Sequence, residues 1–248
     1  QWEAIKEFFP SGNKSKYHKR SLVEAVLYIV KTGCQWRMLP HDYPPHDTVW
    51  SFYRRARNNG VWDKMMKHLV RVTRKQAGRK EWRTELRTDR FTEHKNNVLR
   101  RKSRIWRGKK TKWRKRHIVT DTMGNLLCIR VHAANIHDTK GGIYTFEKAL
   151  YRYPTIQAGC ADGGYRGTFQ NTFDEFHNIR IDISMQIKEQ KGSHVLPKRW
   201  VVERTFAWLN CSRRLSKDYE TSCCSAEAII MISHAATLLK RLWTQALK

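Results

Sequence analysis

Two carboxylates, Asp162 and Glu203, occupy positions from which they could bind a metal ion together. Asp162 follows the small apolar run TIQAGCA and precedes a double glycine in the segment ADGGYRG, so it lies where a strand ends and the backbone can turn. Glu203 lies in the segment RWVVERTFAWL, which predicts a helix over 199–209. Carboxylates placed in this way suit phosphoryl transfer to or from nucleic acid, in which metal ions stabilise both the attacking and the leaving oxygen.

The predicted helix around Glu203 has an apolar face with a polar stripe beside it. The apolar face consists of Val202, Phe206 and Leu209, and the stripe of Arg199, Glu203 and Asn210. Glu203 is therefore expected at the edge of a buried face. A second interpretation remains open, in which Asp162 only forms a turn and Arg199 pairs with Glu203 as a surface ion pair worth a few tenths of a kcal/mol, roughly.

The unusual property of the composition is its large positive net charge. The 248 residues include 49 Lys and Arg against 22 Asp and Glu, which gives a net charge of +27, and 40% of the chain is hydrophobic. Basic residues spread along a globular chain indicate a polyanionic partner, and nucleic acid is the one that rewards them most, through counterion release. Charge alone does not separate an enzyme from a binding protein.

No apolar run long enough to span a membrane and no signal-peptide pattern is found, so we expect a protein inside the cell without a membrane partner. The six cysteines have neither CxxC nor zinc-site spacing. We expect them to be reduced, buried thiols.

Helical periodicity opens the chain, with helices predicted at 2–9, at 21–31, after Asp47 as an N-cap, and at 61–75. The Pro-rich segment before the third helix and the basic character of that helix are compatible with a helix-turn-helix-like DNA-binding region over residues 1–80, and an ordinary helical bundle fits the same pattern. Its reading helix would present Arg54, Arg55 and Arg57.

A strongly basic stretch follows at 71–116 and carries Trp82, Trp106 and Trp113. Basic residues interleaved with aromatic ones suit phosphate contacts and base stacking, although a solvated loop at 90–110 is an equal alternative. The predicted DNA contacts of the basic loop at about 90–116 are Lys109, Lys110, Lys112, Arg114, Lys115 and Arg116.

Beyond this stretch the pattern alternates between strands and helices. The segments RHIVTD and LLCIRVHA, joined by TMGN, predict a β-hairpin, and Asp138 is expected to cap a helix reaching Tyr151. A strand ending at Asp162, a helix over 167–177, a strand over 180–187, the Glu203 helix and a buried helix over 225–243 follow. This order of elements predicts the fold class α/β (α+β), in which a mixed sheet is flanked by helices.

Five segments together resemble the DDE transposases of bacterial insertion sequences, specifically the insertion-sequence five group. They are TGCQWRMLPHDYPPHDTVW, KKTKWRKRHIVTDTMGNLL, VHAANIHD, ADGGYRG and LPKRWVVERTFAWLNCSRRLSKDYE. The resemblance implies an RNase H-like catalytic domain over 81–248, preceded by the helical DNA-binding region. It also implies a DDE triad that holds two Mg²⁺ ions, for which Mn²⁺ can substitute.

The family pattern maps its second and third acids onto Asp162 and Glu203, and a phosphate-contacting arginine onto Arg199. Lys198 and Arg166, which stand in the same two motifs, are further expected DNA contacts. The first acid falls in the segment TELRTDRFTEHKNN, where Asp89 is our choice. The alternatives are Glu85, Glu93 and Asp121.

The resemblance implies a DNA transposase that cleaves the ends of its element and joins them to target DNA. Its partners would be double-stranded terminal repeats, target DNA and a second copy of the chain, in a homodimer or higher homo-oligomer. The expected location is the bacterial cytoplasm, in association with the nucleoid. Because the segment at 83–98 departs from the family pattern, a catalytically inactive, transposase-derived DNA-binding protein is the alternative, and a stand-alone metal-dependent nuclease is a third possibility.

Overall fold

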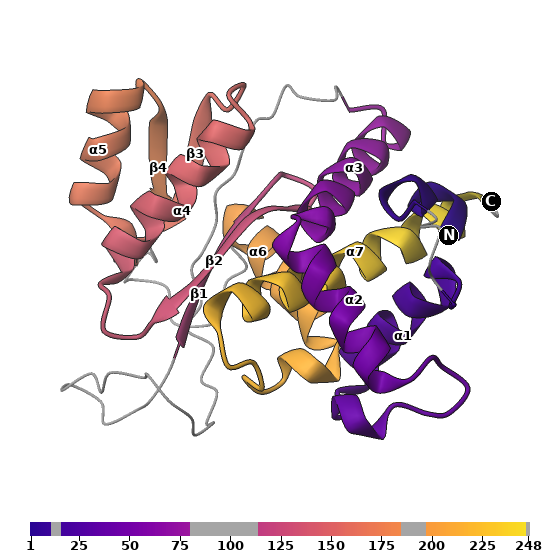
Figure 1. Cartoon of the computed structure of the whole chain (residues 1–248). Coiled ribbons are helices and arrows are strands. Elements are labelled where there is room, and N and C mark those ends of the chain that lie inside the picture. The colour runs from indigo at the N-terminus through magenta and orange to yellow at the C-terminus, as the bar shows by residue number, and fades with distance from the viewer. Residues whose placement is uncertain (11–15, 80–113, 185–196, 247–248) are drawn as a thin grey trace, which may run out of the picture. The chain divides into compact units, whose positions relative to one another are not determined.

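The computed structural model describes residues 1–10, 16–79, 114–184 and 197–246 of the chain (Figure 1). These residues form two compact units. The first unit combines residues 1–77 with 208–248, and the second comprises 78–207. One boundary lies close to the predicted one at 80/81, and the other falls inside a helix near the C-terminus.

The first unit is helical. It contains η1 (Trp2–Ala4), η2 (Lys6–Phe8), α1 (Lys19–Thr32), η3 (Trp36–Met38), α2 (His46–Asn58), α3 (Val61–Gln76), η5 (Arg213–Leu215) and α7 (Cys223–Ala246). The last helix, α7, packs against α3 and α1, so the two ends of the chain share one core (Figure 1).

Aromatic rings fill much of this helical core. Trp62 of α3 is 1% exposed and lies within ring-contact distance of Phe9, Phe52 and Tyr53. The α1 residues predicted to form its apolar side are all buried: Leu22, Val23, Val26, Ile29 and Val30. Their burial confirms the helical pattern of that segment.

The second unit begins with a β-hairpin. Strand β1 (Arg114–Thr120) pairs antiparallel with β2 (Leu126–Ala133), with a register shift between Val119 and Thr120. Nearly every residue of the two strands is buried, which means that both faces of the hairpin are covered. The hairpin predicted around TMGN is confirmed.

A pair of parallel strands forms the rest of the described β-structure. β3 (Ala158–Asp162) and β4 (Arg180–Ser184) pair so that Asp162 lies opposite Ser184 at their carboxyl ends. Between them the chain forms η4 (Gly163–Tyr165) and α5 (Thr168–His177), while α4 (Asp138–Arg152) connects the hairpin to β3. Mixed α and β content is confirmed, although each sheet has only two strands among the described residues.

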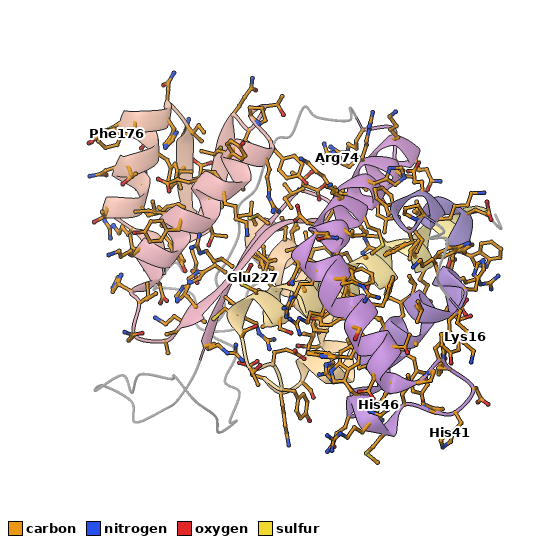
Figure 2. All side chains as sticks on the ribbon, viewed as in Figure 1. Lys16, His41, His46, Arg74, Phe176 and Glu227 are labelled. Atoms are coloured by element: carbon orange, nitrogen blue, oxygen red, sulfur yellow. The ribbon has the colours of Figure 1, made fainter. Side chains whose placement is uncertain are left out.

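The helices α4 and α5 pack together through phenylalanines. Phe146 of α4 lies 4.7 Å from Phe173 of α5, centroid to centroid, and Phe173 lies 4.9 Å from Phe169. All three side chains are fully buried, whereas Phe176 on the outer side of α5 is 78% exposed (Figure 2). The aromatic cluster therefore fixes one face of α5.

Several local predictions are wrong in detail. Residues 2–9 form two short 3-10 turns, η1 and η2, in place of one helix. The N-cap of α2 is Pro45, so Asp47 lies in the first turn, and the N-cap of α4 is His137, whose Nδ1 accepts a hydrogen bond from the Thr139 amide. Asp138 is therefore the first residue of α4 and not its cap.

The predictions about cysteines and apolar length also need correction. All six cysteines are free, as predicted, but only Cys128 and Cys160 are buried. The other four lie at exposed or half-buried positions. Residues Cys223–Thr244 of α7 are long and apolar enough to cross a membrane, which the sequence analysis did not expect. Since 61% of that window is buried in the protein, the hydropathy of α7 is that of a core helix.

Candidate active site

Asp162 lies at the carboxyl end of β3, as predicted, and begins the turn η4. Its Oδ1 accepts a hydrogen bond from the Gly163 amide at 2.8 Å, so the carboxylate caps the turn that follows it. The side chain is half-buried. The sequence dictates this place, because a small apolar strand followed by Gly-Gly ends the strand and permits the turn.

Glu203 lies on α6 (Pro197–Asn210), which begins in the second compact unit and ends in the first. Val202 and Phe206 are buried and Glu203 is exposed, so the predicted helical face is confirmed. Two neighbours of Glu203 bind the turn of the hairpin. Arg204 Nη2 donates to the Met123 carbonyl at 2.9 Å, and the Thr205 hydroxyl donates to the Gly124 carbonyl at 2.8 Å.

These bonds fix the rotation of α6 on the hairpin turn. The Arg204 guanidinium also lies over the Trp200 ring, 4.3 Å from its centroid. Burial lowers the pKa of Arg204, and the charge of nearby Asp121 opposes that shift. The position of Glu203 is therefore set by Arg204 and Thr205, its neighbours on α6, which are bonded to the hairpin turn.

Asp121, one alternative for the first acid, is fully buried and is used by the hairpin turn. Its Oδ1 accepts hydrogen bonds from the amides of Met123 and Asn125, and its Oδ2 accepts one from the Asn125 side chain. A carboxylate occupied in this way has a structural role. The other three possible first acids, Asp89, Glu85 and Glu93, lie outside the described residues.

Within the described ranges, no group of three or more His, Cys, Asp or Glu converges so as to hold a metal ion. Asp162 and Glu203 supply carboxylate oxygens, which are the ligands that Mg²⁺ prefers. The two therefore fit a magnesium site in their chemistry, and the predicted set needs a third acid from the segment that contains Asp89.

The residues predicted to contact DNA differ in how exposed their side chains are. Arg54 and Arg55 are exposed on α2, and Arg166 is exposed directly after η4. Arg57 is half-buried, with its guanidinium 5.9 Å from the centroid of the Tyr53 ring. Lys109, Lys110 and Lys112 lie outside the described residues, as do the side chains of Lys198 and Arg199 on α6.

The basic residues of β1 are less accessible than the sequence suggested. Lys115 is 8% exposed, and its Nζ lies 2.7 Å from Asp138 Oδ1 and 3.0 Å from the Ile136 carbonyl oxygen. Arg116 is 7% exposed, and Arg114 is half-buried. The ammonium of Lys115 joins β1 to the start of α4, a structural role that the sequence analysis did not anticipate.

Sequence reasoning also missed a buried polar cluster beside Asp162. The Tyr165 hydroxyl lies 3.1 Å from His117 Nδ1, and the His117 ring stacks on His132 with centroids 4.5 Å apart. A signal was available, since His117 and His132 lie on the two strands of the predicted hairpin and Tyr165 belongs to ADGGYRG. No local pattern, however, predicts that these three residues meet.

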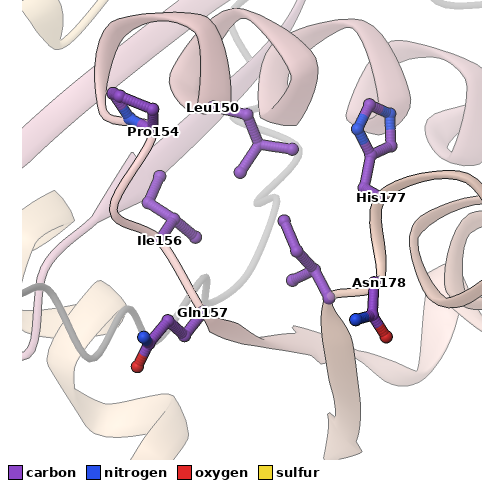
Figure 3. Close-up of a pocket in the computed structure, with 7 residues that line it drawn as sticks. Leu150, Pro154, Ile156, Gln157, His177 and Asn178 are labelled. Atoms are coloured by element: carbon purple, nitrogen blue, oxygen red, sulfur yellow. The ribbon is translucent and has the colours of Figure 1, made fainter.

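A pocket of about 380 Å³ lies at the other end of the parallel strand pair (Figure 3). Its lining includes Ile156 and Gln157, which precede β3, and Ile179, which precedes β4. Because β3 and β4 are parallel, this pocket is at their amino ends, whereas Asp162 is at the carboxyl end. The pocket is therefore distinct from the candidate site.

Comparison with known protein families agrees with the order of these elements. Residues 70–238 match the family model described as "Transposase DDE domain". The chain belongs to the DDE transposases. Residues 1–66 match a second model, "Putative transposase of IS4/5 family", so this DDE transposase is of the insertion-sequence four/five kind.

A curated relative is similar to part of this transposase. "Uncharacterized protein y4sN" of Sinorhizobium fredii (strain NBRC 101917 / NGR234) is 35% identical over 75 residues, which is 29% of this chain and 60% of that protein. The chain thus spans about 60% of the length of the curated relative it matches. No solved structure matches the chain.

Proposed function

We propose that this transposase cleaves the ends of an insertion element and joins them to target DNA by Mg²⁺-dependent phosphoryl transfer. Asp162 and Glu203 are the proposed second and third metal ligands, and Asp89 is the proposed first. The observation that carries the proposal is the placement of the two described carboxylates. Asp162 ends a strand and Glu203 lies on the exposed edge of a helix, both within the residues that match the DDE domain.

The chain contributes position and charge to this reaction. The capped turn orients the Asp162 carboxylate, and the contacts of Arg204 and Thr205 with the hairpin turn orient α6 and so Glu203. Arg166 adds an exposed positive charge four residues after Asp162, where it can contact a DNA phosphate. Bound Mg²⁺ would supply the positive charge that stabilises the attacking and leaving oxygens at phosphorus.

The proposal extends to the fold and the partners. The catalytic part is RNase H-like, and the helices α2 and α3 belong to a DNA-binding region that presents Arg54 and Arg55. The +27 net charge supports double-stranded DNA as the partner. Two element ends must be brought together, so the active form is a homodimer or a larger assembly, in the bacterial cytoplasm and near the nucleoid. Lys115 and Arg116, which are buried, are left out of the proposed DNA contacts.

The test is cleavage of labelled element-end DNA in the presence of Mg²⁺ or Mn²⁺. Asp162→Asn and Glu203→Gln keep the size of each side chain and remove its charge. We expect each to lower the cleavage rate by about 100-fold or more, because preorganised charge at the reacting group is worth about 10²–10³ in rate. Asp89→Asn is expected to do the same.

Matched controls are available on α5, where Asp174 and Glu175 are exposed carboxylates. Asp174→Asn and Glu175→Gln should leave cleavage and Mn²⁺ binding unchanged. Calorimetric titration of the same variants with Mn²⁺ gives a readout independent of cleavage. Undiminished cleavage by Asp162→Asn or Glu203→Gln would refute the assignment, and tight DNA binding by the unaltered protein without metal binding or nicking would favour the inactive DNA-binding alternative.

A further inference from the structure

The turn after Asp162 contains two exposed glycines between its two ends. Gly163 and Gly164 are both exposed, and a Cβ added at Gly164 would meet no atom within 4 Å. Two consecutive glycines have wide conformational freedom. Asp162 caps this turn at one end, and buried Tyr165 anchors it at the other.

Tyr165 is a strong anchor because its ring and its hydroxyl are both engaged. The ring is 2% exposed and lies 5.3 Å from the Phe169 ring, which continues into the Phe146 and Phe173 cluster. The hydroxyl lies 3.1 Å from Nδ1 of His117, a residue 48 positions away on β1. This contact joins the turn that follows β3 to the β1–β2 hairpin.

His117 is itself packed against a ring of the neighbouring strand and against a helix. Its ring stacks on His132, a diagonal neighbour on the same face of the hairpin, with an angle of 18° between the planes. The helix α4 covers both rings at Gly141, where a Cβ would lie 2.2 Å from His132 Nε2 and 2.7 Å from His117 Nε2. His132 Nδ1 donates to its neighbouring Ala133 carbonyl.

The groups of this cluster keep their uncharged forms. Burial lowers the pKa of His117 to about 2, and the coupling with the His132 ring and the positive charge of Lys115 add to that effect, while burial lowers the pKa of His132 as well. Burial also raises the pKa of the Tyr165 hydroxyl, and the charges of Asp138 and Asp162 add to that effect. A neutral phenol and a neutral imidazole at 3.1 Å form a hydrogen bond whose donor is set by the tautomer of the His117 ring.

We propose that the hydrogen bond between Tyr165 and His117 positions the Asp162 carboxylate for metal binding. This inference rests on the proposed role of Asp162 as a metal ligand. Tyr165 and His117 are positioning residues, which touch neither metal nor DNA and act through the turn that Asp162 begins. Groups that orient a metal ligand in this way are typically worth about 10–100-fold in metal affinity or activity.

The variant that tests the proposal is Tyr165→Phe, which deletes the hydroxyl and keeps the ring among the phenylalanines. We expect Mn²⁺ affinity and the kcat for DNA cleavage to fall by about 10-fold or more, with the KM for DNA unchanged. Hydrogen exchange at the Gly163 amide should become faster, because that amide is bonded to Asp162 Oδ1.

Tyr53→Phe is the matched control. Tyr53 is also a fully buried tyrosine, and its hydroxyl is hydrogen-bonded to the Ser225 side chain. Tyr53 and Ser225 both belong to the first compact unit, whereas Tyr165 belongs to the second. The same chemical deletion there should leave Mn²⁺ affinity and Gly163 exchange unchanged. His117→Asn, which keeps a group near the position of Nδ1 that can donate or accept a hydrogen bond, should retain more Mn²⁺ affinity than His117→Leu.

The negative results differ in which proposal they refute. If the unaltered protein binds Mn²⁺ and Tyr165→Phe binds it equally well, losing only thermal stability, the hydroxyl is merely structural and the positioning role is refuted. If the unaltered protein neither binds Mn²⁺ nor cleaves DNA, the proposed function fails and the positioning role falls with it. Equal losses in Tyr165→Phe and Tyr53→Phe would also refute the proposal.

Discussion

Gly141 shows how one residue can decide whether a helix fits its site. The backbone of α4 passes so close to the imidazoles of His117 and His132 that a methyl group would overlap both Nε2 atoms. The residue is fully inside the protein, at the first turn of α4. A glycine within a helix normally lowers stability, and here the close approach explains why it is present.

We expect Gly141→Ala to lower the free energy of unfolding by about 1–3 kcal/mol, because overpacking outweighs the gain in helix propensity. The measurement is urea unfolding followed by circular dichroism. Gly164→Ala is the control, since an added Cβ there meets open space, and its change should stay within about 0.5 kcal/mol. An unchanged or higher stability of Gly141→Ala would mean that the two rings move aside at little cost.

At the scale of elements, a buried ion pair links η5 to the start of α7 and, through a further bond of its arginine, to the loop after α1. Arg214 of η5 and Glu220 are 7% and 9% exposed, with 2.8 Å between Arg214 Nη2 and Glu220 Oε1. Arg214 also donates to the Cys34 carbonyl and lies over the Trp36 ring, and the Ser225 hydroxyl at the start of α7 donates to Glu220. The pair thus connects α7 and η5 with the loop after α1.

Breaking this pair is expected to be costly because it leaves a buried charge without its partner. Glu220→Gln should lower the free energy of unfolding of the helical unit by about 3–5 kcal/mol. The pair of Arg20 and Glu24 on α1 is the control, since Glu24 is 48% exposed. Glu24→Gln should cost about 0.5 kcal/mol or less, and equal effects of the two substitutions would contradict the argument.

At the scale of the whole molecule, each compact unit contains a buried histidine whose pKa is depressed. Burial lowers the pKa of His117 to about 2 in the second unit and that of His234, on α7, to about 3 in the first. The positive charges of Lys115 and Arg241 respectively add to the shifts. Both histidines are therefore neutral in the folded protein over the ordinary pH range.

These depressed values predict that acid destabilises the protein. Below a pH of about 6.5 the unfolded chain binds protons that folded His117 and His234 do not, so the free energy of unfolding falls as pH drops toward the folded pKa values. Each histidine contributes a slope of about 1.4 kcal/mol per pH unit in that window and nothing above it. Unfolding measured at a series of pH values should show this loss.

His234→Leu is expected to reduce the acid slope of the helical unit by the contribution of one histidine. His41, which is exposed in the loop before α2, provides the control (Figure 2). His41→Gln removes an imidazole from an exposed position and leaves the two buried histidines in place, so the slope that His117 and His234 contribute should persist. A slope that His234→Leu does not alter would show that other groups dominate acid unfolding.

The sequence by itself determined the local features of this transposase. The period of apolar residues put Val202 and Phe206 inside and Glu203 outside, the Gly-Gly step ended the strand at Asp162, and TMGN closed the hairpin. Each of these depends on neighbours within a few positions along the chain, so the pattern carries the answer. The joint role of Asp162 and Glu203 in catalysis stays a prediction.

Tertiary structure alone decided which distant residues meet. The contact of Tyr165 with His117 spans 48 positions, the bond of Arg214 to the Cys34 carbonyl spans 180, and α7 joins the core of the N-terminal helices. Lys115 is buried in an ion pair and is therefore not part of the exposed basic surface, and Asp121 accepts hydrogen bonds within the hairpin turn. Such contacts depend on how elements pack, and packing is settled by the whole set of buried faces at once, which local periodicity does not encode.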